Sequence, residues 1–376
     1  MPNKLMKIGI DARFYGSIGK GLGRYTQKLI QHLEHIDKEN HYVVFLRKEN
    51  FNDYQPFNKN FEKVLADYAW YTFAEQLFFP LLLNKQKLDL MHFPHFNVPL
   101  LYSGRFVLTI HDLILTHFPT IRATMLNPVF YWFKYVAYKL AISSALWRAK
   151  KIITVSEFTK KDIISKYPKV SEKMVVTYEA CDDTCQISKD SPHHILEKYG
   201  IIKQYILYVG NAYPHKNLER LIESFELISG KFPDLRLALV GKEDFFYARL
   251  KKMVIEKNIP NVQFLGFVSD ADLDVLYRFA ECYVFPSLYE GFGLPPLEAM
   301  AKGTPVVCSD HPCMQEILGS AAFYENAKNS ESFAEAISKV LDDKVLKENL
   351  VAKGYEQIKK YSWDKMARET AEVYLS

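Results

Sequence analysis

The sequence predicts an α/β protein made of two doubly wound parallel sheets in tandem. Short, continuously apolar runs alternate with helical patterns, which is typical of parallel strands whose two faces are covered by helices. The alternation weakens between about residues 180 and 200, where polar residues dominate, and then restarts. The 376 residues correspond to about two domains, since a domain commonly has roughly 100–200 residues.

The first half supplies the first sheet. Apolar runs predict strands at 7–11, 42–46, 88–93, 106–110, 152–155 and 174–178. Apolar residues at helical spacing predict an amphipathic helix that ends near residue 36, and a long helical stretch covers 126–149. The polar segment 180–200 is interpreted as a linker with a short helix.

The second half repeats this pattern. We expect strands at 205–209, 235–240, 262–265, 282–286 and 305–308, with helices at 218–228, 247–257 and 270–280. About the last 45 residues are helical in pattern. Doubly wound sheets bind ligands at the carboxyl ends of their strands. Two such Rossmann-like domains therefore predict an interdomain cleft.

Composition excludes several classes of protein. With 48% hydrophobic and 24% charged residues, the chain is globular rather than disordered or fibrous. A net charge of +4 gives no reason to expect nucleic acid as a partner. Five cysteines without a CxxC pair favour a reduced, cytoplasmic protein, and no His/Cys set completes a zinc site around Cys181 and Cys185. Neither a signal peptide nor a membrane-spanning segment is expected.

A glycine cluster follows the first predicted strand. Gly16, Gly19, Gly21 and Gly23 precede Arg24 at the start of the first helix. Glycines let backbone N–H groups approach an anion, and a helix N-terminus favours negative charge. The spacing is neither GxGxxG nor a P-loop, so the cluster favours a loop facing a phosphate or a sugar. A flexible loop without a ligand remains the alternative.

The turn YVGNAYPHKN follows the first strand of the second half and contains Gly210 and Asn211. Lys216 lies just before the next helix, for which Asn217 is a candidate cap. A lysine at such a turn is well placed to meet a diphosphate, although most lysines in turns are simply solvated.

The most informative segment is PSLYEGFGLPPLEAMAKGTPV, a strand end, a Gly/Pro loop and a helix. Glu290 precedes the helix and Glu298 lies eight positions later. Gly291 and Gly293 permit close backbone approach, and the loop amides together with the helix dipole favour phosphate. The two carboxylates can accept hydrogen bonds from hydroxyls, so the segment suits a nucleotide sugar.

His111 ends a strand of the first half, in the segment THD. Its ring can donate to or accept from a sugar hydroxyl. A single histidine at a strand end is also often structural, so both interpretations stay open.

Together these segments resemble glycosyltransferase family 4, whose members are retaining enzymes with the GT-B fold. EGFGLPPLEAMAKGTPVV resembles its E-x7-E signature, YVGNAYPHKN resembles its G-x5-K-N turn, and TIHDLI and VSEFTKKDI are similar to its first-domain features. The start, GIDAR…GLGRYTQKLI, is similar to the sub-branch rich in mannosyltransferases for surface polysaccharides. The resemblance covers almost the whole chain.

The resemblance implies roles for individual residues. Glu290 would contact the donor sugar, Glu298 the ribose hydroxyls, and Lys216 the diphosphate. His111 would face the donor sugar near the reacting carbon, with Asp112 beside it. The remaining implied donor-site residues are Gly210, Asn211, Gly291, Phe292, Gly293 and Leu294, and the diphosphate and acceptor loop would comprise Gly19, Gly21, Gly23 and Arg24.

The resemblance also implies a domain plan. Residues 1–185 would form the acceptor-side domain and 186–360 the donor-binding domain, and a helix at 361–376 would cross back to the first domain with Trp363 and Tyr374 as packing residues. One departure matters, because many members carry Arg where this chain has Asn211. Arg24 or Arg13 are candidates to replace that positive charge.

We expect no cofactor and no metal ion, because Lys216 and oriented amides can neutralise a diphosphate. Asp182 with Asp183, and Asp272 with Asp274, look like possible DxD metal sites. The second pair is better explained by acidic residues near a helix start. The family is thought to use same-face attack, with the leaving phosphate taking the proton of the acceptor.

The segment 127–151 is aromatic and basic, and it contains no acidic residue. Aromatic and basic side chains suit a membrane interface with anionic lipid, whereas a buried helix of the first domain is the alternative. Peripheral attachment to the cytoplasmic face of a membrane would fit a lipid-linked acceptor.

We therefore expect a hexosyltransferase that moves mannose from GDP-mannose to a glycan or lipid-linked glycan acceptor. A UDP-sugar-dependent glucosyl-, galactosyl- or N-acetylglucosaminyltransferase is the first alternative. A nucleotide-sugar epimerase of the same fold is a second, and a non-catalytic glycan-binding paralogue, for which Asn211 leaves an opening, is a third.

Overall fold

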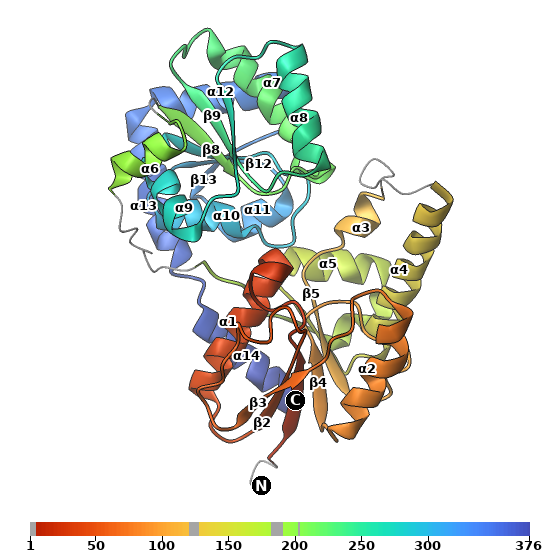
Figure 1. Ribbon diagram of the computed structural model, residues 1–376. Helices are drawn as coiled ribbons and strands as arrows, with labels where there is room; N and C mark the ends of the chain where they lie inside the picture. Colours follow the sequence, from red (N-terminus) through yellow and green to blue (C-terminus); the bar gives the residue numbers. More distant parts are fainter. Residues whose placement is uncertain (1–4, 120–127, 182–190, 202–203) are drawn as a thin grey trace. The chain divides into compact units, whose positions relative to one another are not determined.

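A computed structural model describes residues 5–119, 128–181, 191–201 and 204–376 (Figure 1). The chain divides into two compact units. Unit 1 comprises Met1–Glu179 and Ser362–Ser376, and unit 2 comprises Ala180–Tyr361. The expected boundary after residue 185 falls outside the described ranges. Within those ranges, no helix has both the length and the apolar character needed to cross a bilayer.

Unit 1 is built on a parallel sheet of seven strands in the order β3-β2-β1-β4-β5-β6-β7. The sheet order reverses between β1 and β4, as in a doubly wound fold. The strands are β1 (Lys7–Asp11), β2 (His41–Leu46), β3 (Phe61–Leu65), β4 (Leu90–Phe93), β5 (Phe106–Ile110), β6 (Lys151–Thr154) and β7 (Met174–Val176).

Helices cover both faces of this sheet. One apolar core lies under α2, α4 and α5, to which they contribute Phe79, Ile142 and Ile163. On the other side α1 packs against α14 (Figure 1). Among its described residues, unit 1 has the helices η1 (Gly16–Gly19), α1 (Lys20–Ile36), α2 (Phe73–Lys85), α3 (Ile114–His117), α4 (Pro128–Arg148), α5 (Glu157–Lys166), η3 (Pro168–Lys173) and α14 (Trp363–Leu375).

The last helix, α14, is joined to unit 1 by a buried hydrogen bond as well as by packing. Trp363 and Tyr374 are 5% and 1% exposed, which confirms that they are packing residues. The Tyr374 hydroxyl also lies 2.7 Å from His92 Nδ1 on β4. His92 Nε2 in turn lies 2.8 Å from Thr109 Oγ1. Because His92 is fully buried, burial lowers its pKa to about 3, and the imidazole is neutral.

Unit 2 repeats the plan with six parallel strands in the order β10-β9-β8-β11-β12-β13. Its strands are β8 (Tyr205–Val209), β9 (Arg236–Val240), β10 (Val262–Gly266), β11 (Cys282–Phe285), β12 (Val306–Ser309) and β13 (Ala322–Glu325). Its helices are α6 (Pro192–Lys198), η4 (Pro214–Lys216), α7 (Leu218–Ser229), α8 (Phe245–Glu256), α9 (Asp270–Phe279), α10 (Leu294–Ala301), α11 (Pro312–Leu318), α12 (Ser330–Asp342) and α13 (Lys344–Ile358).

Two doubly wound parallel sheets confirm the predicted fold class. The expected strands recur with ends that differ by one or two residues. The sequence prediction omitted β3 and β13, which lie at the edges of the two sheets, and it also omitted the helices α2, α3, α5 and α11.

Candidate active site

The candidate donor site of unit 2 lies where the order of its sheet reverses. β8 and β11 are neighbours at this point, and a doubly wound sheet binds ligands beyond the carboxyl ends of such strands. The chain leaving β8 carries the turn that contains Lys216. The chain leaving β11 carries Glu290. Two segments far apart in sequence therefore meet at one edge of the sheet.

Lys216 and Glu290 form an ion pair there. Lys216 Nζ lies 2.5 Å from Glu290 Oε1, and the two side chains are 15% and 9% exposed. The ammonium group also lies 5.5 Å from the centre of the Phe285 ring. The structure thus brings together the two residues expected to contact the diphosphate and the donor sugar. Both are largely buried, and charge interactions are stronger there than in bulk water.

The turn after β8 is held by hydroxyl groups of buried tyrosines. Tyr208 Oη donates to the carbonyl of Asn211 at 2.8 Å, and Tyr247 Oη donates to the carbonyl of Gly210 at 2.7 Å. Gly210 has φ of 153°, and a Cβ there would lie 2.7 Å from Tyr208 Oη. Only glycine fits this position without displacing the tyrosine.

Asn217 fixes the end of the same turn. It occupies the N-cap position of α7 with φ of 61°, but its side chain makes no capping bond. Instead, Nδ2 donates to the carbonyl of Ala327 at 2.7 Å and to that of Pro286 at 3.3 Å. Because Pro286 follows β11, this amide ties the lysine turn to the segment that carries Glu290.

The side chains around Lys216 add no second positive charge to the turn. Burial, together with the nearby charge of Lys216, lowers the pKa of His215 to about 4, so this imidazole is neutral near pH 7. Asn211 Oδ1 accepts from the backbone N–H of Tyr213 at 3.3 Å. Asn211 therefore stabilises the turn, and it supplies no cation at this position.

The loop before α10 offers backbone amides rather than a complete helix N-terminus. Gly293 is the N-cap with φ of 90°, and a Cβ there would lie 2.6 Å from Met314 Cε. Pro295 and Pro296 follow Leu294 in the first turn and have no N–H. The backbone N–H groups at this end therefore belong to Gly291, Phe292, Gly293 and Leu294 rather than to the two prolines.

Glu298 lies in the second turn of α10 and accepts a hydrogen bond from Tyr277 Oη at 3.0 Å. Burial raises the pKa of Tyr283 well above its usual range, and the nearby charges of Glu298 and Glu290 raise it further. Both glutamates therefore lie close to one buried tyrosine of β11. The sequence prediction missed the contact of Tyr277 with Glu298.

In unit 1, the glycine cluster is explained mainly by packing. A Cβ on Gly19 would lie 2.2 Å from the carbonyl oxygen of Phe14, and one on Gly23 would lie 2.1 Å from that of Gly16. These glycines let α1 approach the chain leaving β1. Gly21 is exposed with open space around it. Arg24 follows on α1 and is partly exposed.

His111 lies next to the start of α1 and between two hydrogen-bond acceptors. Its Nδ1 is 2.9 Å from Glu179 Oε1, and its Nε2 is 3.1 Å from the carbonyl of Pro94. The ring of Tyr25, on α1, meets the imidazole edge-on with centroids 4.7 Å apart. Both nitrogen contacts are hydrogen bonds only when both ring nitrogens carry protons, or when Glu179 is protonated. The sequence prediction missed Glu179.

The chain matches known glycosyltransferases in both of its halves. The pattern described as Glycosyl transferases group 1 matches residues 196–357, and that described as Glycosyltransferase Family 4 matches residues 19–184. O-antigen chain mannosyltransferase RfbU of Salmonella typhimurium is 30% identical over 277 residues, 73% of this chain and 71% of that protein. The chain belongs to glycosyltransferase family 4. It is a hexosyltransferase, as the sequence predicts.

One further relative and one solved structure are similar to the glycosyltransferase over nearly its whole length. O-antigen chain mannosyltransferase B of Escherichia coli is 29% identical over 377 residues, which cover 94% of this chain and 95% of that protein. The fold is similar to that of sucrose-phosphate synthase from Thermosynechococcus elongatus, with a TM-score of 0.77, 20% identity and 98% of each chain covered. The GT-B fold is thereby confirmed.

Arg13 of the glycosyltransferase is committed to a buried ion-pair cluster, which corrects the suggestion that it replaces the missing arginine of the donor site. Its guanidinium contacts Asp11 and Glu75, each at 2.7 Å, and its side chain is fully buried. It also stacks on Phe79, with its central carbon 4.1 Å from the ring centre. Asn97 donates to Glu75 at 2.8 Å. All of these groups have partners inside unit 1.

The possible DxD pair on α9 has ion-pair partners within the protein. Asp272 lies 2.7 Å from Lys198 Nζ, and Asp274 lies 2.5 Å from Lys302 Nζ. Hydrogen bonding to Lys198 lowers the pKa of Asp272. Asp182, Asp183 and Cys185 lie outside the described residues. Within the described ranges, no group of three or more His, Cys, Asp or Glu side chains is arranged to hold a metal ion.

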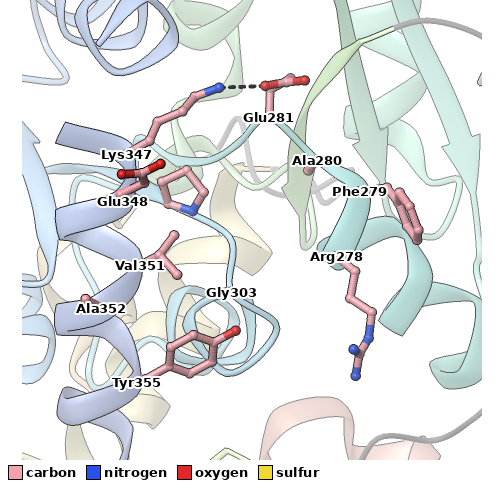
Figure 2. Close-up of a pocket in the computed structure, with 11 residues that line it drawn as sticks. Arg278, Phe279, Ala280, Glu281, Gly303, Lys347, Glu348, Val351, Ala352 and Tyr355 are labelled. Carbon is pink, nitrogen blue, oxygen red and sulfur yellow. Dashed lines mark hydrogen bonds and ion pairs between the residues drawn. The ribbon is translucent and has the colours of Figure 1, made fainter. Parts of the chain in front are cut away.

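A hollow in unit 2 lies at the other end of the strands, where β11 and β12 begin. Figure 2 shows that α9 and α13 line it, with Gly303 between them. Its charged groups are paired, since Lys347 Nζ lies 2.6 Å from Glu281 Oε2. Glu281 precedes β11, whereas Glu290 follows it, so this hollow is separate from the candidate donor site.

Proposed function

We propose that this glycosyltransferase transfers mannose from GDP-mannose to a glycan or lipid-linked glycan acceptor in the synthesis of a surface polysaccharide, with retention at the anomeric carbon. The observation that carries the proposal is the similarity to two O-antigen chain mannosyltransferases, one of them over nearly the whole length of both chains. The ion pair and amide loop of unit 2 support a donor that carries a diphosphate.

The proposed donor site combines one cation with oriented amides. Cleavage of the bond to the diphosphate places negative charge on the leaving group, which a lysine and preorganised N–H groups stabilise. Glu290 already balances the charge of Lys216 in the free protein. Once a diphosphate binds, the ammonium group of Lys216 would interact with both Glu290 and the diphosphate. The backbone amides of Phe292, Gly293 and Leu294 would therefore supply much of the remaining attraction for the diphosphate.

The carboxylates are proposed to select the donor rather than to neutralise it. Glu290 would accept a hydrogen bond from a hydroxyl of the donor sugar. Glu298, which Tyr277 orients, would accept from the ribose. We retain for His111 the role of a contact with the donor sugar, and we propose that Glu179 orients its ring. Binding without a metal ion and same-face attack complete the proposal.

A thermal-unfolding panel tests the donor. A ligand that binds only the native state stabilises it by about 2.7 kcal/mol at a concentration of 100 times its Kd. We expect GDP and GDP-mannose to raise the melting temperature, with no change on addition of EDTA. Stabilisation by UDP, UDP-glucose, UDP-galactose or UDP-N-acetylglucosamine alone would replace GDP-mannose by a UDP-sugar.

The Lys216→Met variant is the control in this panel. It keeps the length of the side chain but removes the charge, so it should lose most of the ligand-induced shift. An equal shift in this variant would move the diphosphate away from Lys216. No shift with any nucleotide in the unaltered protein would contradict the proposed donor site.

A further inference from the structure

Unit 1 exposes large apolar side chains on the outer sides of two helices and on the loop between β4 and β5. Their exposed fractions range from 49% to 88%. They are Phe73, Leu77, Phe78 and Leu81 on α2, Leu100 and Leu101 on the loop, and Trp132, Val136, Leu140 and Trp147 on α4. We call these ten residues the apolar surface. Apolar patches of this kind commonly mark a site of contact with a protein or a membrane.

The ten residues belong to one layer of the fold. Phe79 of α2 and Ile142 of α4 point into the same core, so both helices cover the same face of the sheet (Figure 1). The loop joins them, because the backbone N–H of Leu100 donates to Gln76 of α2 at 2.8 Å. Arg148 of α4 donates to the carbonyl of Pro99 at 3.4 Å.

Regular spacing places the exposed residues of each helix on one side. Phe73, Leu77 and Leu81 recur every four residues, and so do Trp132, Val136 and Leu140. The opposite side of α4 is buried through Ile142, Ala145 and Leu146. The helix therefore satisfies both earlier interpretations, with one side in the core and the other outside. The side chains of Phe130, Tyr131 and Phe133 lie outside the described residues.

The exposed charges on α2 and α4 themselves are of one sign. α4 contains no Asp or Glu, and the one acidic residue of α2, Glu75, is fully buried against Arg13. Lys85 on α2 and Lys134 on α4 are exposed. A second copy of this chain would bring positive charge against positive charge. An anionic surface would instead meet complementary charge.

We propose that the apolar surface docks unit 1 onto the interface of a bilayer that contains anionic lipid. Leucine and phenylalanine side chains on one side of a helix enter the boundary between headgroups and acyl chains. Tryptophan is favoured at this depth, because its ring is apolar and its N–H is polar. Lysine stems extend along apolar surface while their ammonium groups reach lipid phosphates. This inference does not depend on the identity of the donor.

Co-sedimentation of the full chain with vesicles tests the proposal. We expect binding to mixed phosphatidylcholine–phosphatidylglycerol vesicles at low salt and much weaker binding to phosphatidylcholine alone. The double variant Leu77→Gln/Leu140→Gln changes side chains that are 51% and 64% exposed, so folding should be unaffected. It should weaken vesicle binding by about tenfold or more, because two apolar contacts with the bilayer are lost.

Two further variants separate the apolar and electrostatic contributions to vesicle binding from non-specific adsorption of exposed apolar side chains. Ile255→Gln/Phe267→Gln alters side chains of unit 2 that are 73% and 80% exposed, and it should bind vesicles like the unaltered protein. Lys85→Gln/Lys134→Gln should lose roughly tenfold or more at low salt, with little further loss at high salt.

Several outcomes would overturn the docking proposal. These are no binding to anionic vesicles, equal binding to neutral vesicles, or equal losses in the unit 1 and unit 2 apolar variants. Sedimentation velocity measures the oligomeric state of the protein in the absence of lipid. A dimer that the Leu77→Gln/Leu140→Gln variant abolishes, in a protein that does not bind vesicles, would assign the surface to self-association instead.

Discussion

Removing the hydroxyl of Tyr374 tests how firmly the end of the chain belongs to unit 1. The hydroxyl lies 2.7 Å from His92 Nδ1, and the two residues are 1% and 0% exposed. In Tyr374→Phe the aromatic ring still fills the same space, but His92 Nδ1 loses its hydrogen-bond partner in a position that water does not reach. An unsatisfied buried group costs about 1–3 kcal/mol, more than the net value of an ordinary hydrogen bond.

The four tryptophans make the measurement specific to one unit. Trp70, Trp132, Trp147 and Trp363 all belong to unit 1, so intrinsic fluorescence follows the unfolding of that unit. A loss of about 1–3 kcal/mol should lower the urea midpoint of the fluorescence transition by roughly 0.5–1 M, since the slope for domains of this size is a few kcal/mol per M.

A neighbouring tyrosine provides the control. Tyr361 Oη donates to the carbonyl of Ile317 at 2.8 Å, and both residues belong to unit 2. Tyr361→Phe should therefore leave the fluorescence midpoint of unit 1 unchanged, although it removes a hydroxyl only two residues before α14. An unchanged midpoint in Tyr374→Phe, or equal shifts in both variants, would refute the claim that the His92 contact anchors α14.

Three further predictions follow from the same geometry. Burial lowers the pKa of His92 to about 3, so between about pH 6.5 and 3 the unfolded chain binds a proton that the folded chain does not. The free energy of unfolding, followed by fluorescence, should therefore fall by about 1.4 kcal/mol per pH unit over this range on account of His92. His92→Gln should reduce that slope. Gly23→Ala places a Cβ 2.1 Å from the carbonyl oxygen of Gly16 and should lower the midpoint, whereas Gly21→Ala meets open space and should raise it by about 0.5–1 kcal/mol in stability. Asn211→Arg should tighten GDP binding several-fold in calorimetry, because it adds a cation to a site whose lysine is already paired; unchanged affinity would place the diphosphate elsewhere.

The fold was predictable from sequence to the extent that its strands are buried on both faces. β5 and β8, for example, are continuous apolar runs in the sequence and are almost fully buried. β3 and β13 were missed because edge strands are half-exposed and mix polar with apolar residues, as in the FEKVL run of β3. α2 is apolar around much of its circumference and contains Pro80, so helical periodicity is weak there.

The donor-site prediction was strongest where a motif is continuous in sequence. The turn with Lys216 and the loop with Glu290 each follow one strand, and the meeting of those strands follows from the topology of a doubly wound sheet. Pairings across long separations were not predictable. Glu179 lies 68 residues from His111, and nothing in either local segment indicates their contact.

Arg13 shows the opposite error. The sequence prediction named it as a candidate to replace the positive charge missing at Asn211. Its actual partner Glu75 lies on a helix that the sequence prediction omitted, and the resulting cluster is buried. Glycines gave a similar ambiguity, because close packing of backbone and binding of an anion both require the absence of a Cβ. In the structure Gly23 packs against the carbonyl of Gly16, whereas Gly21 has open space around it.

The most direct test of the proposed mannosyl transfer is the release of GDP from GDP-mannose in the presence of a lipid-linked glycan acceptor, measured for the unaltered chain and for Glu290→Gln. This variant keeps the shape of the side chain and an acceptor oxygen, but it removes the charge next to Lys216. We expect acceptor-dependent release by the unaltered chain and a loss of at least about a hundredfold in the variant, with an unchanged far-ultraviolet circular dichroism spectrum. Undiminished release by the variant, or release of UDP from a UDP-sugar and none from GDP-mannose, would contradict it.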